Sequence, residues 1–305
     1  MKKVLVTGGT GFIGQHSLPL LFDKGYEVHA VSSQPINSSN PEVHWHQANL
    51  LEPAEVSRLM FQVKPSHLLH FAWFAIPGKY WTALENFQWV QGSLSLLQEF
   101  AQYGGQRVVM AGTCAEYNWD YGYCSEKVTP LDPKTLYGRC KNSLQSLLDA
   151  YAGQTGISSA WGRIFFAYGP HEYGDRLVPS VIRSLLQGKT APCSHGNQIR
   201  DFLYVKDVAD AFVSLLESPV SGPINIASGQ PVPLKDIIYQ VAEILNGSEL
   251  IELGVIPTSA TEPPLVMGDI GRLKDELCWQ PQFSLNQGLN ETITWWKNQT
   301  DAYKN

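Results

Sequence analysis

The chain has 305 residues, of which 44% are hydrophobic and 16% are charged, and its formal net charge is −6. The low charge content excludes a disordered chain and favours a large buried core. The negative balance offers no basic surface for nucleic acid or anionic lipid, so we expect neither partner. Apolar stretches fall short of the 18 or so residues of a membrane span, so we expect a cytoplasmic protein without membrane association. Five cysteines lack a Cys-x-x-Cys pair, and we expect no metal site.

The first elements are a predicted strand, a glycine-rich turn and a predicted helix. The strand covers residues 3–7, the turn reads Gly-Gly-Thr-Gly-Phe-Ile-Gly over residues 8–14, and the helix covers residues 15–24. Glycine is needed where backbone turns tightly and approaches a diphosphate, and the helix N-terminus then supplies free N–H groups. With a second strand at 26–31, this arrangement predicts a dinucleotide-binding site.

The end of the second strand bears on the choice of cofactor. A carboxylate about 20 residues after the glycines usually binds the ribose hydroxyls of NAD, but residues 30–34 read Ala-Val-Ser-Ser-Gln. Ser32 and Ser33 can donate hydrogen bonds to the 2′-phosphate of NADP, which a carboxylate would repel. We therefore expect NADP(H) in preference to NAD(H). NAD(H) stays open, because no Arg or Lys lies close to these serines in the sequence.

Strands and helices alternate along the following residues. Strands are expected at 42–47, 67–72, 107–112 and 158–166, and helices at 53–63, 81–103 and 137–155. This alternation predicts an α/β fold of the Rossmann type, a doubly wound parallel sheet. Frequent Pro and Gly after Tyr168 predict a smaller, interleaved substrate lobe. We expect residues 1–166 and about 199–218 in the cofactor-binding domain, and residues 167–198 and 219–305 in the substrate-binding lobe.

Tyr137 and Lys141 lie four residues apart on a predicted helix and hence on one face. On spacing alone, an exposed pair without chemistry is the simpler interpretation. However, a nearby cation lowers the pKa of a tyrosine from about 10 toward neutrality, as acid–base catalysis requires. Thr113 follows the strand at 107–112, at the sheet edge where ligands bind. The three side chains together predict proton transfer at a substrate oxygen.

These motifs resemble the extended short-chain dehydrogenase/reductases that act on nucleotide sugars. The resemblance covers nearly the whole chain and is carried by residues 7–14, 70–72, 113–117, 137–141, 163–170, 200–209 and 225–229. It implies that Thr113, Tyr137 and Lys141 are catalytic, and that a homodimer forms through a four-helix bundle of the helices at 81–103 and 137–155. The expected cofactor contacts are Gly8, Gly11, Phe12, Ile13, Gly14, Ser32, Ser33, Asn49, Leu50, Phe71, Ala72, Tyr137 and Lys141. The expected substrate contacts are Trp73, Thr113, Phe166, Arg176 and Arg200.

The chain also departs from the family pattern. The family's dehydratases carry Asp-Glu directly after the catalytic Thr, whereas Cys114 and Ala115 stand here, so we do not expect dehydration. We expect Glu116 to face away from the site and Cys114 to be a small filler rather than an acid. A structural pair with Asp201 or Asp207 fits Arg200 equally well on sequence alone, and the resemblance favours substrate binding.

These observations predict NADPH-dependent reduction of a 4-keto-6-deoxy nucleotide sugar in deoxysugar biosynthesis, with Tyr137 as the acid. One alternative is an NAD-dependent nucleotide-sugar epimerase. A second is a non-catalytic dinucleotide-sensing protein on the same fold, against which Thr113, Tyr137 and Lys141 argue. Trp73, Trp81 and Trp119 fit either core packing or an aromatic wall around the sugar.

Overall fold

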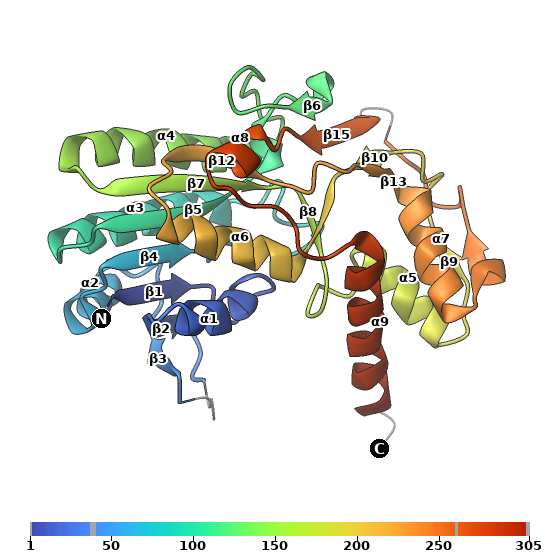
Figure 1. Cartoon of the computed structure of the whole chain (residues 1–305), viewed down its shortest axis with the longest axis horizontal. Helices are drawn as coiled ribbons and strands as arrows, with labels where there is room; N and C mark the ends of the chain where they lie inside the picture. Colours follow the sequence, from blue (N-terminus) through green and yellow to red (C-terminus); the bar gives the residue numbers. More distant parts are fainter. Residues whose placement is uncertain (1, 37–40, 260–261, 303–305) are drawn as a thin grey trace.

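A computed structural model describes residues 2–36, 41–259 and 262–302, which form two lobes (Figure 1). The larger lobe contains a seven-stranded sheet in the order β12-β7-β5-β4-β1-β2-β3, with all strands parallel. The expected doubly wound α/β fold is therefore confirmed. The strands are β1 (Lys3–Thr7), β2 (Glu27–Ser32), β3 (Val43–Gln47), β4 (His67–His70), β5 (Arg107–Thr113), β7 (Ser158–Ile164) and β12 (Gly222–Ile226).

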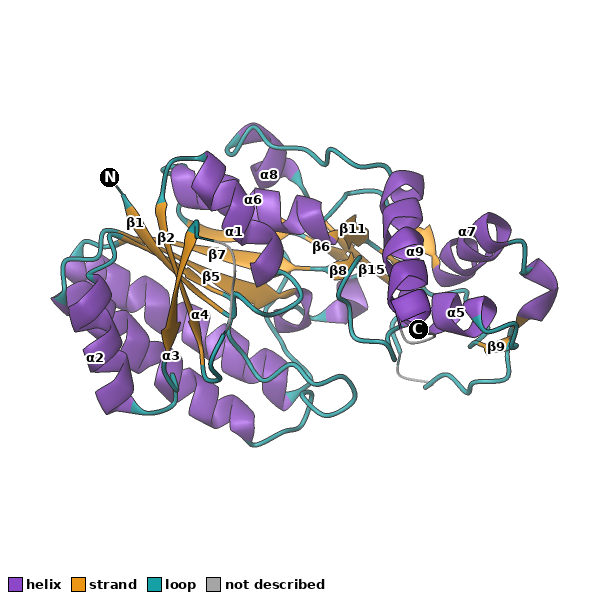
Figure 2. Ribbon diagram, turned by 90° about the horizontal axis from the view of Figure 1, so that it is seen from below, coloured by secondary structure: helices purple, strands orange, loops and turns teal. Residues whose placement is uncertain are grey.

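Helices cover both faces of this sheet (Figure 2). One face packs against α1 (Gly14–Asp23), α6 (Val205–Glu217) and α8 (Gly271–Asp275), and the other against α2 (Pro53–Val63), α3 (Glu85–Gln102) and α4 (Leu136–Thr155). Each interface has its own apolar core, with Phe212 buried on the first face and Leu144 on the second. Because both faces are covered, the central strands are apolar without alternation, as in the run Val4-Leu5-Val6.

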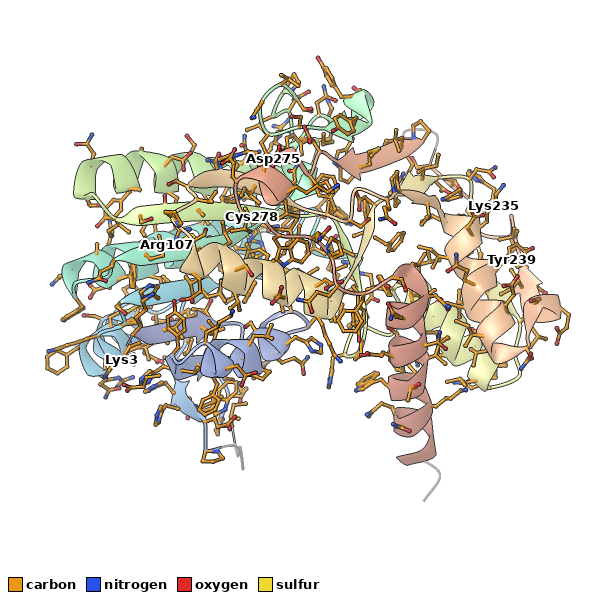
Figure 3. All side chains as sticks on the ribbon, viewed as in Figure 1. Lys3, Arg107, Lys235, Tyr239, Asp275 and Cys278 are labelled. Carbon is orange, nitrogen blue, oxygen red and sulfur yellow. The ribbon has the colours of Figure 1, made fainter. Side chains whose placement is uncertain are left out.

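Arg107 at the start of β5 joins the sheet to the end of α6 (Figure 3). Its Nη1 donates to Ser158 Oγ at 2.7 Å, and its Nη2 donates to the carbonyls of Leu215 at 2.6 Å and Val220 at 2.7 Å. The side chain is buried. These three hydrogen bonds offset part of the cost of burying the guanidinium, whose Nε has no partner among the described residues. Through them Arg107 fixes the amino-terminal edge of the sheet, away from the ligand-binding edge.

The smaller lobe packs three helices, α5 (Leu177–Leu186), α7 (Leu234–Leu245) and α9 (Leu285–Ala302), around a core that includes Ile182, Ile238 and Leu289. Short strands link this lobe to the sheet. They are β8 (Phe166–Tyr168) with β11 (Phe202–Tyr204), β9 (Ala191–Pro192) with β14 (Ile251–Glu252), and β6 (Tyr123–Cys124), β10 (Ile199–Arg200), β13 (Val232–Pro233) and β15 (Leu265–Gly268) in one sheet. Among the described residues, no helix combines the length and apolarity of a membrane span.

The boundary between the lobes differs from the expected one at β12. This strand pairs with β7 in the central sheet, from Gly222 opposite Ala160 to Ile226 opposite Ile164, although residues 219–305 were expected in the substrate lobe. Ile224 and Ile226 are fully buried there. The strand is short and follows a Pro- and Gly-containing stretch, which reads as a loop in the sequence. We therefore correct the division so that residues 222–226 belong to the larger lobe.

The segment after β4 also differs from expectation. The strand predicted at 67–72 ends at His70, because Ala72 N donates to Thr7 Oγ1 at 3.1 Å and leaves the ladder. The helix predicted at 81–103 begins only at Glu85. Asn86 explains the delay, since its Nδ2 donates to the carbonyls of Tyr80 at 2.7 Å and Ala83 at 2.8 Å and stabilises a non-helical turn. This turn places several aromatic side chains over the sheet edge.

Candidate active site

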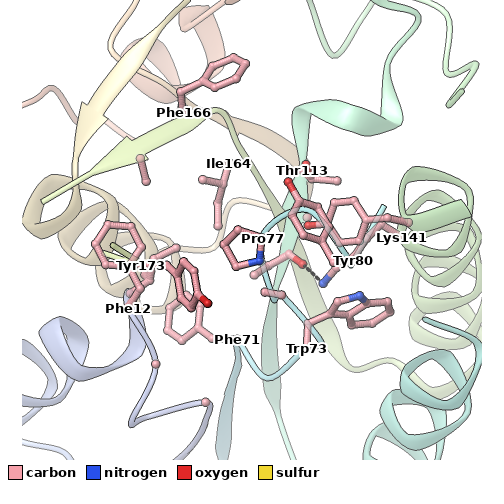
Figure 4. Close-up of a pocket in the computed structure, with 18 of the residues that line it drawn as sticks. Phe12, Phe71, Trp73, Pro77, Tyr80, Thr113, Lys141, Ile164, Phe166 and Tyr173 are labelled. Atoms are coloured by element: carbon pink, nitrogen blue, oxygen red, sulfur yellow. Dashed lines mark hydrogen bonds between the residues drawn. The ribbon is translucent and has the colours of Figure 1, made fainter. Parts of the chain in front are cut away.

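A cavity of about 1170 Å³ lies at the carboxyl ends of the central strands and reaches into the smaller lobe (Figure 4). This volume exceeds the roughly 300–1,000 Å³ of most small-molecule sites, and so offers room for a dinucleotide and a second ligand. Every residue that the sequence predicts for the site lines it: Gly8, Gly11, Phe12, Ile13, Gly14, Ser32, Ser33, Asn49, Leu50, Phe71, Ala72, Trp73, Thr113, Tyr137, Lys141, Phe166, Arg176 and Arg200. The individual roles remain predictions.

The glycine turn between β1 and α1 has the backbone that a diphosphate requires. Gly8 has a φ of +69°, and a Cβ there would lie 2.8 Å from Ala72 N. A Cβ on Gly14 would collide with the Gly8 carbonyl. No side chain caps the N-terminus of α1, so its backbone N–H groups can meet an anion. The residues present therefore fit a dinucleotide.

The other end of the cavity is formed by the ends of β2 and β3. Ser32 Oγ accepts a hydrogen bond from Gln34 N at 3.1 Å, and Asn49 Oδ1 accepts one from Leu51 N at 3.1 Å. The backbone N–H of Asn49 donates to Glu55 at 2.7 Å. Among the described lining residues, this end carries serine hydroxyls and an amide but no carboxylate.

Thr113 and Tyr137 meet at the ends of β5 and α4. Thr113 Oγ1 accepts from Ala115 N at 3.2 Å, and the Thr113 side chain lies close enough to Tyr137 to lower the pKa of its phenol. Gly138 permits this approach, because a Cβ there would collide with the Ala115 carbonyl. Burial raises the pKa of Tyr137 and the neighbouring Tyr80 raises it further, while the nearby Thr113 lowers it. Tyr137 is therefore protonated at neutral pH, the state of a proton donor.

Lys141 lies one helical turn after Tyr137 and is only 3% exposed. Its Nζ donates to the Ala111 carbonyl at 2.8 Å. Burial lowers the pKa of Lys141 to about 7, and the Glu116 carboxylate offsets only part of that effect. Lys141 thus titrates near neutrality instead of carrying a permanent charge, which sequence reasoning does not foresee.

Aromatic rings surround Tyr137. Tyr80 lies 4.8 Å from it between ring centroids, Trp81 lies at 5.8 Å and Trp73 at 6.4 Å, all edge to face. Trp119 extends the group, with its centroid 6.3 Å from that of Trp81. We call these four side chains the aromatic wall, and all of them line the cavity. Trp73, Trp81 and Trp119 were candidates for such a wall, whereas Tyr80 was missed.

The two arginines of the cavity have different surroundings. Arg200 donates from Nη2 to Glu262 Oε1 at 3.0 Å and lies over the Phe166 ring at 5.6 Å. Arg176 donates from Nη2 to the Tyr80 hydroxyl at 3.4 Å, and so lies beside the aromatic wall. The sequence offered Asp201 or Asp207 as structural partners of Arg200, but neither is its partner.

Those two aspartates instead accept backbone hydrogen bonds. Asp201 binds the N–H groups of Ser228, Gly229 and Gly268, while Asp207 binds those of Gln282 and Phe283. Glu262, the actual partner of Arg200, is 62 positions away in the chain. A sequence pattern gives no signal for such a pairing, because the two residues meet only through the arrangement of β10 and the segment before β15.

Glu116 and Cys114 follow Thr113 but do different things. Glu116 is fully buried, is absent from the cavity wall, and forms an ion pair with Arg163 at 2.6 Å. Cys114 lines the cavity, where burial raises the pKa of its thiol. Glu116 faces away from the site, as expected, and the Cys114 thiol keeps its proton at neutral pH.

Comparison with known proteins identifies the family. A sequence model for the NAD dependent epimerase/dehydratase family matches residues 4–227. UDP-glucuronic acid decarboxylase 1 of Danio rerio is 27% identical, covering 100% of this chain and 75% of that protein. UDP-glucose 4-epimerase of Neisseria meningitidis serogroup C is 27% identical, covering 99% of both.

Solved structures agree with this assignment at the level of the fold. The UDP-glucose 4-epimerase of Thermotoga maritima, determined with UDP-glucose, superposes with a TM-score of 0.87 at 23% identity, covering 98% of this chain and 99% of that one. The family model over residues 4–227 confirms the resemblance inferred from the motifs. The chain belongs to the NAD-dependent epimerase/dehydratase family, a family of enzymes.

Proposed function

We propose that this enzyme moves a hydride and a proton at a single carbon of a nucleotide sugar. The observation that carries the proposal is the group of Thr113, Tyr137 and the buried Lys141 on one wall of the cavity. Cys114 and Ala115 follow Thr113, so the carboxylates that eliminate water in dehydratases have no counterpart at these two positions. Hydride and proton transfer at one carbon needs a single acid–base side chain, and Tyr137 can serve as that group.

Each of the three side chains has a distinct task. Tyr137 donates its phenolic proton to the substrate oxygen in reduction and takes it back in oxidation. Thr113 orients that oxygen by hydrogen bonding, and Lys141 stabilises the phenolate with its positive charge. A nicotinamide dinucleotide, when bound, supplies or accepts the hydride.

The first specific candidate is reduction of a 4-keto-6-deoxy nucleotide sugar by NADPH. Three features support it. Ser32 and Ser33 stand at the end of β2 without a carboxylate nearby in the cavity wall, Tyr137 is protonated, and the aromatic wall suits the apolar methyl group of a 6-deoxy sugar.

The second candidate is 4-epimerisation with NAD. A UDP-glucose 4-epimerase that matches this chain over 99% of both lengths supports it. Epimerisation at C4 by oxidation and re-reduction needs no acid or base beyond Tyr137, so the same side chains serve both candidates.

Extraction of bound nucleotide and a turnover assay separate these candidates. The purified full chain is denatured and its nucleotide identified, and the native chain is given NADPH with a 4-keto-6-deoxy nucleotide sugar. Stoichiometric NADPH consumption supports the reductase. Tightly held NAD with interconversion of 4-epimers supports the epimerase. Inactivity across a panel of nucleotide sugars despite normal NADP binding contradicts both and supports a dinucleotide sensor.

We also propose that two copies of the chain associate through α3 and α4. These helices pack side by side on one face of the sheet. Their outer surface carries large exposed apolar side chains, including Phe87, which is 54% exposed, and Leu147, which is 46% exposed. Exposed apolar groups of this size favour an interface. Light scattering tests the proposal, since a monomer mass at micromolar concentration contradicts it.

A further inference from the structure

We propose that Trp73 is a positioning residue for Lys141, because its indole face binds the lysine ammonium, favours its charged form over the neutral amine and fixes it beside Tyr137. This inference rests on the proposed function, in which Lys141 supports proton transfer by Tyr137. Trp73 is a predicted substrate contact, but in the structure its indole face lies against Lys141.

The contact between the two side chains is direct. Lys141 Nζ lies 3.8 Å from the centroid of the Trp73 ring, well inside the roughly 6 Å limit for a cation–π interaction. The next ring, Trp161 on β7, lies at 5.8 Å. Figure 4 shows Trp73 and Lys141 on the same side of the cavity. The indole therefore covers one side of the ammonium group while the Ala111 carbonyl accepts one of its protons.

Trp73 is held in this orientation by its own anchor. Its Nε1 donates to Asn86 Oδ1 at 2.8 Å. Asn86 is fully buried, and its Nδ2 is fixed by two backbone carbonyls of the turn before α3. The Trp89 ring packs beside the indole, with centroids 6.3 Å apart. A ring fixed at its N–H and along its side presents a constant face to Lys141.

The charged and titratable groups around Lys141 do little to stabilise its ammonium form, so much of that stabilisation comes from the Trp73 indole. From the turn after β5, the Glu116 carboxylate acts on Lys141 only through space, because its own contacts go to Arg163, Trp161 and Thr113 N. From β4, the buried His70 imidazole has its pKa lowered to about 3 and carries no charge at neutral pH.

Tyr137 and Cys140, on the same helix, are further titratable neighbours of Lys141, and the pKa of each is raised by burial, so both are protonated at neutral pH. Among residues 2–36, 41–259 and 262–302, no carboxylate forms an ion pair with Lys141. A buried ammonium without a direct counter-ion loses its proton easily. The indole face compensates for that missing counter-ion.

The test measures the protonation of Lys141 directly. The full-length chain is labelled with [13Cε]lysine, and the Lys141 resonance is assigned as the one missing from Lys141→Met. Its titration midpoint is compared between the wild type, Trp73→Met and Trp73→Phe. Met fills space with an unbranched apolar chain but has no π face. We expect the midpoint to fall by about one pH unit in Trp73→Met and by less in Trp73→Phe, which keeps a ring.

Trp119→Met is the matched control, because it removes an indole of the same cavity that makes no cation–π contact with Lys141 and does not pack against Trp73. We expect the Lys141 midpoint of this control to match that of the wild type. An unchanged or raised midpoint in Trp73→Met overturns the inference, and so does an equal shift in Trp119→Met. The NMR titration needs no substrate, so a failure of the proposed nucleotide-sugar activity is detected separately by the turnover assay.

Where turnover is measurable, the same variants give a second readout. The alkaline limb of kcat moves to lower pH in Trp73→Met, because a smaller fraction of Lys141 is charged. A merely structural Trp73 would lower kcat equally at all pH values.

Discussion

Two buried cations lie close to Thr113, and their surroundings differ sharply. Arg163 on β7 is 1% exposed and donates to Glu116 Oε2 at 2.6 Å and to the Tyr117 hydroxyl at 3.0 Å. Burial lowers its pKa, but Glu116 and Tyr117 outweigh this effect and the net shift is upward. Lys141 is 3% exposed and has a carbonyl and an indole in place of a carboxylate.

The difference distinguishes a cation with a fixed charge, Arg163, from a cation that titrates near neutral pH, Lys141. A guanidinium paired with a carboxylate stays charged at every accessible pH and serves as a fixed support. An ammonium without a counter-ion titrates near neutrality, so its charge responds to what binds beside it. Glu116 links Arg163 to Thr113, because its Oε1 accepts from Thr113 N at 2.8 Å while its Oε2 binds Arg163. We therefore expect changes near Arg163 to alter stability and changes near Lys141 to alter turnover.

The largest effect is expected from Glu116→Ala. Removing one partner of a fully buried pair leaves the Arg163 guanidinium without a counter-ion, which costs about 3–5 kcal/mol. A urea titration followed by tryptophan fluorescence measures the loss in the free energy of unfolding.

The matched control is Asp175→Ala, which breaks the surface pair of Asp175 and Arg183, whose side chains are 76% and 43% exposed. A surface pair of this kind contributes about 0–1 kcal/mol. Equal losses in the two variants would show that burial does not distinguish the Glu116 pair.

Tyr137→Phe, in contrast to Glu116→Ala, should lower turnover and leave stability unchanged. Removal of the phenolic hydroxyl eliminates the proton donor, so we expect turnover to fall at least about 10²-fold. Thermal unfolding and the binding of NADH or NADPH, followed by fluorescence titration, should stay near the wild-type values because the ring itself is kept. Near-normal turnover would remove Tyr137 from the proposed role.

Lys141→Met tests whether Lys141 titrates near neutral pH, because that titration makes the free energy of unfolding depend on pH. The pKa of Lys141 is about 7 in the folded chain and about 10.4 in an unfolded one. Between these values the unfolded chain binds a proton that the folded chain does not, so the contribution of Lys141 to the free energy of unfolding rises with pH. Relative to Lys141→Met, we expect the wild type to gain about 2 kcal/mol from pH 7 to pH 9.

Urea titrations of both proteins at the two pH values give this difference directly. A constant difference would mean that Lys141 stays fully charged up to pH 9, as Arg163 does. Lys141 and Arg163 would then both be permanently charged, and their different surroundings would not affect their protonation.

The parts of the site that were predictable from sequence depend on local geometry. The glycine turn at residues 8–14 works through backbone conformation within seven residues, and Tyr137 and Lys141 face one way because a helix repeats every 3.6 residues. These local geometries do not depend on contacts with distant parts of the chain. The place of Thr113 at a strand end follows in the same way, because parallel strands present their carboxyl ends at one edge.

The parts that were missed depend on contacts between distant segments. Tyr80 enters the site because Asn86 stabilises a turn before α3, and Glu262 reaches Arg200 across 62 positions. Trp73 and Lys141 are 68 positions apart in the chain, and no periodicity relates them. The near-neutral titration of Lys141 is a property of its burial. Each of these features requires the packed structure, because the same residue types occur elsewhere without these partners.

Cys114→Ala should have the smallest effect of the four substitutions. Cys114 follows Thr113 directly in the chain, lines the cavity and is 5% exposed. Burial, and then the nearby Cys124, raise the pKa of its thiol, whereas a cysteine that exchanges protons during catalysis needs a thiolate accessible near neutral pH. We expect turnover within about threefold of the wild type, well below the 10²-fold scale of acid–base catalysis. A loss of thirtyfold or more with unchanged thermal stability would give Cys114 a proton-transfer role and place a second acid–base group beside Tyr137. The chemistry would then extend beyond one carbon, which neither the reductase nor the 4-epimerase requires.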